Sequence, residues 1–162
     1  MLLTVINENL KILIKRKGNF VMSKMNRHQH RIVALQVLYG LDLRGRMAED
    51  EVILELKRLA KNEDAPKLDQ DDDYYFQLIR GVILTRGELD GIIQELSIDW
   101  EIERLSSLVR NILRLALWEL ENEVPEGVVI NEAVELAKEF DGQKAASFIN
   151  GVLGRKVRGG RD

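Results

Sequence analysis

Residues 105–124 read LSSLVRNILRLALWELENEV, the most apolar stretch of this 162-residue chain. Its aliphatic side chains recur at helical spacing and cover more of the helix surface than the single stripe of a surface helix. A helix that is apolar on several sides is buried on several sides, so this stretch is predicted to be the central helix of a bundle. The apolar positions are Leu105, Leu108, Val109, Ile112, Leu113, Ala116, Leu117 and Leu120.

Helical spacing also dominates the rest of the chain, and no segment shows the sustained period-two alternation of strands. Asn26 is placed to cap a helix that runs to about Leu43. Gly81, Gly87 and Gly91 are expected to bend the helix that contains them or to let a neighbour approach closely. The other predicted helices cover 48–61, 71–96 (opened by three Asp residues), 125–142 (from Pro125 to a stop at Gly142) and 146–157. The chain is therefore predicted to be all-α, a single-domain bundle of six or seven helices.

The two ends of the chain are expected to lie outside this domain. Residues 1–21 lack the apolar core and cleavage site of a signal peptide, and translation is expected to begin at Met22 or Met25. The alternative is a weakly amphipathic additional helix. The domain itself is predicted to span 22–157, with 158–162 as a basic flexible tail.

Composition argues for a binding protein. The chain has no Cys and only two His, which excludes disulfides and Cys nucleophiles and disfavours a His-rich metal site. Neither a Ser-His-Asp arrangement nor a phosphate-binding Gly loop is present at the required spacing. We therefore predict a binding protein with no catalytic residue and no metal.

Charge is distributed unevenly along the sequence. Residues 1–46 hold nine Lys or Arg and two acidic residues, whereas residues 47–154 hold eleven and twenty-four. Basic ends on an acidic protein suit the binding of a polyanion, and Arg and His side chains can contact phosphates and stack on unpaired bases. The candidate residues at the N-terminal end are Lys24, Arg27, His28, His30 and Arg31. Without a ligand, the same residues would be a solvated helix end.

Six segments in order make the pattern specific. They read RHQHRIVALQVLYGLD, YYFQLIRGV, LDGII, NILRLALWEL, VPEGVVINEAVELAKEF and SFINGVLGRK. Together they resemble the successive blocks of the NusB family of bacterial transcription antitermination proteins, over about residues 26–157.

The resemblance implies a cytoplasmic, non-catalytic factor that needs no cofactor and binds the boxA element of ribosomal RNA leaders. It implies NusE, a small-subunit ribosomal protein, as partner, and loading of the pair onto RNA polymerase. Residues 27–31 match the family's arginine-rich RNA-binding segment, with His in place of some Arg, so binding is expected to strengthen when the histidines gain charge at acidic pH. Lys144, Arg155 and Lys156 are further RNA candidates. The NusE surface is expected to include Tyr39, Tyr75, Phe76 and Val109, the last at a position where the family often has an acidic residue.

Two other interpretations and one question stay open. The first is that the chain is a detached domain of an RNA cytosine methyltransferase, since one family of these enzymes carries a similar domain ahead of its catalytic domain. The second is that the chain is a helical protein–protein adaptor that does not bind RNA. The sequence also leaves open whether the chain forms a homodimer.

The pair Asn150-Gly151 violates helix propensity inside the predicted last helix. We interpret it as a packing device. Gly151 is expected to bring this helix close to another backbone, and Asn150, like Asn131, is expected to hydrogen-bond to a neighbouring element.

Overall fold

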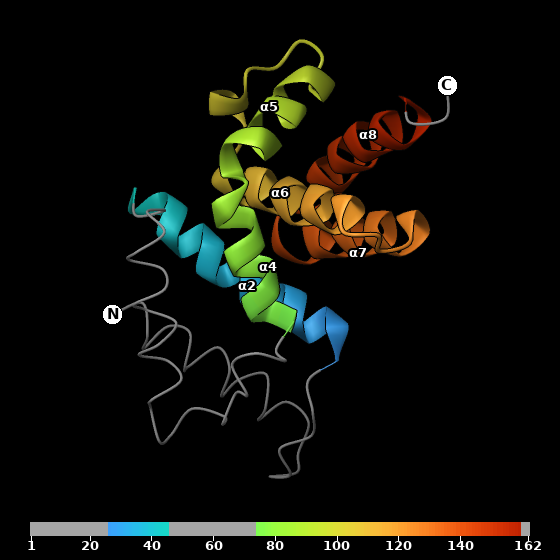
Figure 1. Ribbon diagram of the computed structural model, residues 1–162. Coiled ribbons are helices and arrows are strands. Elements are labelled where there is room, and N and C mark those ends of the chain that lie inside the picture. Colours follow the sequence, from blue (N-terminus) through green and yellow to red (C-terminus); the bar gives the residue numbers. More distant parts are fainter. Residues whose placement is uncertain (1–25, 46–73, 160–162) are drawn as a thin grey trace, which may run out of the picture. The chain divides into compact units, whose positions relative to one another are not determined.

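The computed structural model describes residues 26–45 and 74–159, and in these ranges it contains helices and no strand. The prediction of an all-α fold is confirmed. The chain divides into two compact units, Met1–Ile83 and Leu84–Asp162. The described helices are α2 (Arg27–Leu43), α4 (Tyr74–Leu84), α5 (Arg86–Leu96), the short 3₁₀ helix η1 (Ile102–Arg104), α6 (Ser107–Glu121), α7 (Glu126–Phe140) and α8 (Gln143–Gly159). Figure 1 labels the α-helices.

Several predictions concern residues outside the described ranges. They include the extension over 1–21, the helix over 48–61, the three Asp residues at 71–73 and the side chain of Lys24. The domain boundaries at 22 and 157 likewise stay predictions.

Helix α2 begins where the sequence predicts. The Asn26 side chain accepts a hydrogen bond from the Gln29 backbone N–H at 2.9 Å, and the Gln29 side chain accepts one from the Asn26 N–H at 2.9 Å. This reciprocal capping box satisfies two backbone donors that a helix start otherwise leaves unpaired. Helix α2 then buries Leu35 and Leu38 almost completely.

The helix predicted over 71–96 is interrupted. Thr85 leaves helical geometry with φ −114° and ψ 15°, so that α4 ends at Leu84 and α5 begins at Arg86. The three glycines flagged as bending points all lie inside α4 or α5. The break falls instead at a β-branched residue, which restricts its own χ1 rotamers in a helix and lowers helix propensity.

Helix α6 is the buried helix that residues 105–124 predict. Ser106 caps it by accepting a hydrogen bond from the Val109 N–H at 3.1 Å, and every residue from Asn111 to Leu117 is buried. Helix α6 packs against α5, α7 and α8 of the same unit, which explains why its apolar surface is so wide.

A polar network crosses the contact between α5 and α6. Arg114, with its side chain 5% exposed, donates to both carboxylate oxygens of Asp90, at 2.6 and 2.9 Å. It also donates to Asn111 Oδ1 at 3.1 Å, and Asn111 in turn donates to the Ser107 carbonyl at 2.7 Å. The forked geometry matches guanidinium to carboxylate and fixes how α5 lies on α6.

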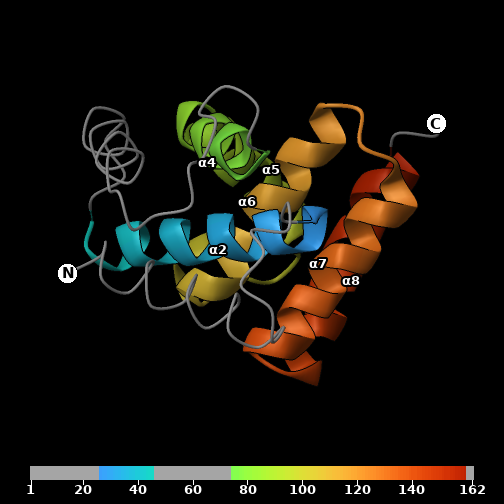
Figure 2. The same ribbon diagram turned by 90° about the horizontal axis from the view of Figure 1, so that it is seen from below.

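Helices α7 and α8 form a tight pair in this unit. Pro125 precedes α7, and Gly142 ends it with φ +105° and an N–H that donates to the Ala137 carbonyl at 2.8 Å, both as predicted. The two-residue link turns the chain so that α7 and α8 lie side by side (Figure 2). Helix α8 is longer than predicted, since it begins at Gln143 and includes Arg158 and Gly159 of the expected flexible tail.

The predicted packing role of Asn150-Gly151 is wrong. Among the described residues, the one atom within 4 Å of a Cβ added at Gly151, apart from its own helix backbone, is Arg155 Nη1 at 3.8 Å. Asn150 and Asn131 are both exposed, so neither is placed to bridge to a neighbouring element. A Cβ at Gly151 would therefore meet one side-chain atom of its own helix at ordinary van der Waals distance, and no second backbone among the described residues lies close to it.

We predict that Gly151→Ala raises the free energy of unfolding by about 0.5–1 kcal/mol, because Ala is the better helix former and its methyl group meets only ordinary van der Waals contact. Urea unfolding followed by circular dichroism measures the change. The matched control is Gly142→Ala, which should lower stability by about 1 kcal/mol or more, because φ is positive there. A destabilised Gly151→Ala variant would restore the packing interpretation.

Candidate nucleic-acid interface

The start of α2 places an exposed cation against an aromatic ring. Arg27 is the first residue of the helix, and its guanidinium carbon lies 4.0 Å from the centroid of the Tyr74 ring. Arg31, one turn later, is 5% exposed, and its guanidinium carbon lies 5.9 Å from the same centroid. The two predicted RNA-binding arginines thus differ, since Arg27 reaches solvent and Arg31 is enclosed.

His30 is also part of the internal packing of this unit. Its Nδ1 accepts a hydrogen bond from the Tyr75 backbone N–H at 3.1 Å, and its ring stacks on the Tyr75 ring at a centroid distance of 5.8 Å. An Nδ1 that accepts a hydrogen bond carries no proton, so His30 is neutral in this arrangement. A proton on Nδ1 is incompatible with this hydrogen bond.

Helical spacing distinguishes the basic residues of α2 that lie on its apolar side from those that face solvent. His30 and Arg31 lie four or five positions before Leu35, and seven or eight before Leu38, so all four share one side of α2. That side is the apolar side. A density of basic residues predicts a phosphate-binding segment, whereas the spacing shows which of them face the core.

Tyr74 is the residue of this cluster that the sequence did not single out. It opens α4 within the segment YYFQLIRGV, from which only Tyr75 and Phe76 were selected. Its ring meets Arg27, Arg31 and, edge on at 6.4 Å, the His30 ring. Its place in the sequence gives no signal for this role, because only the contact between α2 and α4 brings Tyr74 to the basic segment.

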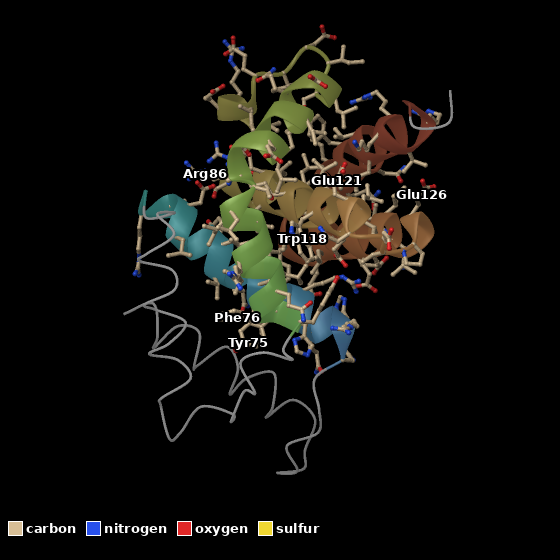
Figure 3. All side chains as sticks on the ribbon, viewed as in Figure 1. Tyr75, Phe76, Arg86, Trp118, Glu121 and Glu126 are labelled. Carbon is tan, nitrogen blue, oxygen red and sulfur yellow. The ribbon has the colours of Figure 1, made fainter. Side chains whose placement is uncertain are left out.

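In the second unit, the predicted RNA-binding residues on α8 fall into two groups. Lys144 is exposed in the first turn of the helix. Arg155 Nε donates to the Leu96 carbonyl at 2.9 Å and so satisfies an acceptor at the end of α5. Lys156 Nζ lies 3.0 Å from a carboxylate oxygen of Glu121, which Figure 3 labels at the end of α6.

The predicted partner residues also differ in accessibility. Tyr39 is 38% exposed and Phe76 is half-buried, whereas Tyr75 and Val109 are buried. Figure 3 labels Tyr75 and Phe76 in the first turn of α4. The structure tests neither the partner role of these residues nor the RNA role of the basic ones, and both stay predictions.

The described residues offer neither a metal site nor a membrane-spanning helix. No group of three or more His, Asp or Glu side chains in 26–45 and 74–159 is arranged to hold a metal ion. In the same ranges no helix has the length and apolarity that a membrane crossing requires.

Comparison with known sequences gives a consistent result. Residues 28–158 match the model of the NusB family. A transcription antitermination protein NusB from Halothermothrix orenii is 41% identical over 135 residues, which is 83% of this chain and 98% of the relative. The same-named protein of Clostridium botulinum is 41% identical over 142 residues, covering 82% of this chain and all of the relative.

Solved structures agree with the sequences. T. maritima NusB matches with a TM-score of 0.69 at 29% identity, over 84% of this chain and 93% of that one. A chain from the crystal structure of antitermination factors NusB and NusE in complex with dsRNA matches with a TM-score of 0.64 at 32% identity, over 83% and 99%.

We predict that His30→Ala lowers the free energy of unfolding by about 2 kcal/mol, because the buried Tyr75 N–H loses its acceptor. His30→Asn should recover part of this loss, since an Asn side-chain oxygen can take the place of Nδ1. Thermal and urea unfolding of both variants measure the difference. If His30→Asn were no more stable than His30→Ala, the hydrogen bond would not be the source of the stability.

Proposed function

Because the chain belongs to the NusB family, we propose that it is a transcription antitermination factor that binds RNA together with NusE. The RNA is the boxA element of ribosomal RNA leaders, and the pair joins the antitermination complex on RNA polymerase in the cytoplasm. The protein acts by binding and carries out no catalysis.

One observation carries this proposal. A chain from a complex of NusB, NusE and dsRNA matches this protein over 83% of its length at 32% identity. The curated relatives that match over nearly their whole length are named as antitermination proteins and not as enzymes. This supports an antitermination factor over a methyltransferase fragment or an adaptor without RNA.

In each of the two units, the RNA contacts that we propose begin with basic residues that still offer hydrogen-bond donors to solvent. Arg27 is the exposed cation at the start of α2, and Lys144 is the exposed cation at the start of α8. His30 and Arg31 support the RNA contacts of their own unit from its interior, through their contacts with Tyr75 and Tyr74. His28, Arg155 and Lys156 are half-buried and are assigned a secondary role.

The NusE surface that we propose centres on Tyr39 and Phe76. Tyrosine is enriched among the residues that dominate protein–protein binding, and Tyr39 keeps more than a third of its surface accessible. Tyr75 and Val109 are buried, each within its own unit, and we assign them an indirect role in NusE binding.

We predict that the protein binds boxA RNA weakly alone and more tightly when NusE is present. Fluorescence anisotropy measures this with labelled boxA RNA and with a scrambled RNA of the same composition, each with and without NusE, at one stated salt concentration. The expected result is a preference for boxA that increases with NusE.

The outcomes of this experiment separate the competing interpretations. Equal affinity for both RNAs under both conditions would contradict a boxA-specific factor. Binding to NusE without binding to either RNA would favour the adaptor.

We predict that Lys144→Ala lowers the slope of log affinity against log salt by about 0.7–0.9, the value for one lost phosphate contact. The matched control is Lys138→Ala, which removes the same charge from the end of α7, where Lys138 pairs with Glu135 at 3.6 Å. An unchanged slope for Lys144→Ala would remove this residue from the RNA surface.

A further inference from the structure

Tyr74, the first residue of α4, places its aromatic ring beside the guanidinium of Arg27, the first residue of α2. The 4.0 Å between the Arg27 guanidinium carbon and the Tyr74 ring centroid is a close cation–π distance. A planar guanidinium whose carbon lies 4.0 Å from the ring centroid has room to stack its flat face on the ring. Its five N–H donors lie along its edge, so the stack leaves them available for hydrogen bonds.

No other described residue restrains Arg27 in the same way. No carboxylate in the described part of the chain pairs with it, and the first turn of α2 contains no acidic residue. A long side chain in water samples many rotamers, and binding a phosphate must select one of them. Contact with Tyr74 makes part of that selection before RNA arrives, which is how preorganisation raises affinity.

Tyr74 is suited to this task because it is itself held in place. Its side chain is 9% exposed, and its ring also meets His30 edge on at 6.4 Å. The hydrogen bond from the Tyr75 N–H to His30 Nδ1 fastens the start of α4 to the first turn of α2. Figure 3 labels Tyr75 at this end of α4. Ring and guanidinium therefore belong to two helix ends with a fixed separation.

We infer that Tyr74 is a positioning residue for RNA binding, which holds the Arg27 guanidinium by its face so that its edge is directed at an RNA phosphate. The inference rests on the proposed function and adds a residue to it. Tyr74 itself touches Arg27 and not the RNA.

A double-mutant cycle tests this inference in the full chain with NusE present. Labelled boxA RNA is titrated with the wild type, Arg27→Ala, Tyr74→Leu and the double variant. Arg27→Ala should weaken binding about tenfold, as expected for a lost charge-assisted hydrogen bond. Tyr74→Leu should weaken it about two- to fivefold, the scale of an exposed cation–π contact, and should add no further loss once Arg27 is Ala. Tyr74→Phe should keep wild-type affinity, because its ring keeps the charge distribution that attracts a cation.

The controls match each change. Arg44→Ala removes the same charge from the other end of α2, 17 residues and thus about 25 Å away, and should change affinity little because salt screens that distance. Gln77→Leu changes an exposed residue one turn from Tyr74 on α4. Circular dichroism checks that each variant is folded.

A second measurement covers the case in which Tyr74→Leu does not fold. In the proton NMR spectrum of the wild type and of Tyr74→Phe, the Arg27 side-chain methylene signals should be shifted upfield by the ring. Unshifted signals in the wild type would overturn the inference.

The results also distinguish this inference from the proposed function. If Tyr74→Leu weakened binding equally with and without Arg27, Tyr74 would contact RNA directly and the inference would be wrong, while the function would stand. Unchanged affinity of Tyr74→Leu would have the same meaning. A wild-type protein that binds boxA no better than scrambled RNA would overturn both.

Discussion

Burial of α6 on several sides is the constraint on which the second unit depends. Its residues from Asn111 to Leu117 are all buried, and α5, α7 and α8 each pack against it. Each of these three helices buries fewer residues than α6 does. The unit is stable because α6 gives each neighbour an apolar surface to cover, and covering that surface also fixes where the helix ends that carry Lys144 and Arg155 lie within the unit.

An entirely apolar α6 would fit its neighbours in more than one way, and its polar residues limit that freedom. Arg114 and Asn111 need partners because an unpaired buried polar group costs about 1–3 kcal/mol, more when charged. Asp90 satisfies the guanidinium in one orientation of α5, with two bonds at 2.6 and 2.9 Å. A buried ion pair adds little net stability by itself. Its effect here is to make other placements of α5 on α6 unfavourable.

The sequence predicts the elements of this fold well and their surroundings less well. Asn26, Pro125 and Gly142 act through local backbone chemistry, so their roles are visible in the residues themselves. The wide apolar side of α6 is likewise a property of one segment. The break at Thr85 is not, because three glycines nearby give stronger local signals than the residue at which the helix ends.

In the candidate site, too, the sequence identifies the segment but not the contacts that its residues make. Residues 27–31 are recognisable as a basic segment, yet burial of His30 and Arg31 depends on α4, which lies more than 40 residues away in sequence. Gly151 is a similar case, because a glycine that lies against a second backbone and one that lies beside a side chain of its own helix look alike in sequence. In both cases the open question is what a residue faces, which periodicity suggests but does not determine.

Three arginines show which property marks a cation as free to bind a ligand. Arg114 uses its N–H edge on Asp90 and Asn111, so its hydrogen-bonding capacity is directed inward. Arg155 uses its Nε to cap the end of α5. Arg27 uses its face on Tyr74, which restrains the side chain without occupying the donors at its edge. Net charge counts the three alike, and exposure alone separates them only in part. A better criterion is whether the N–H donors of the guanidinium are already used within the fold. By this criterion Arg27 is the one of the three that is held in place and can still bind a phosphate.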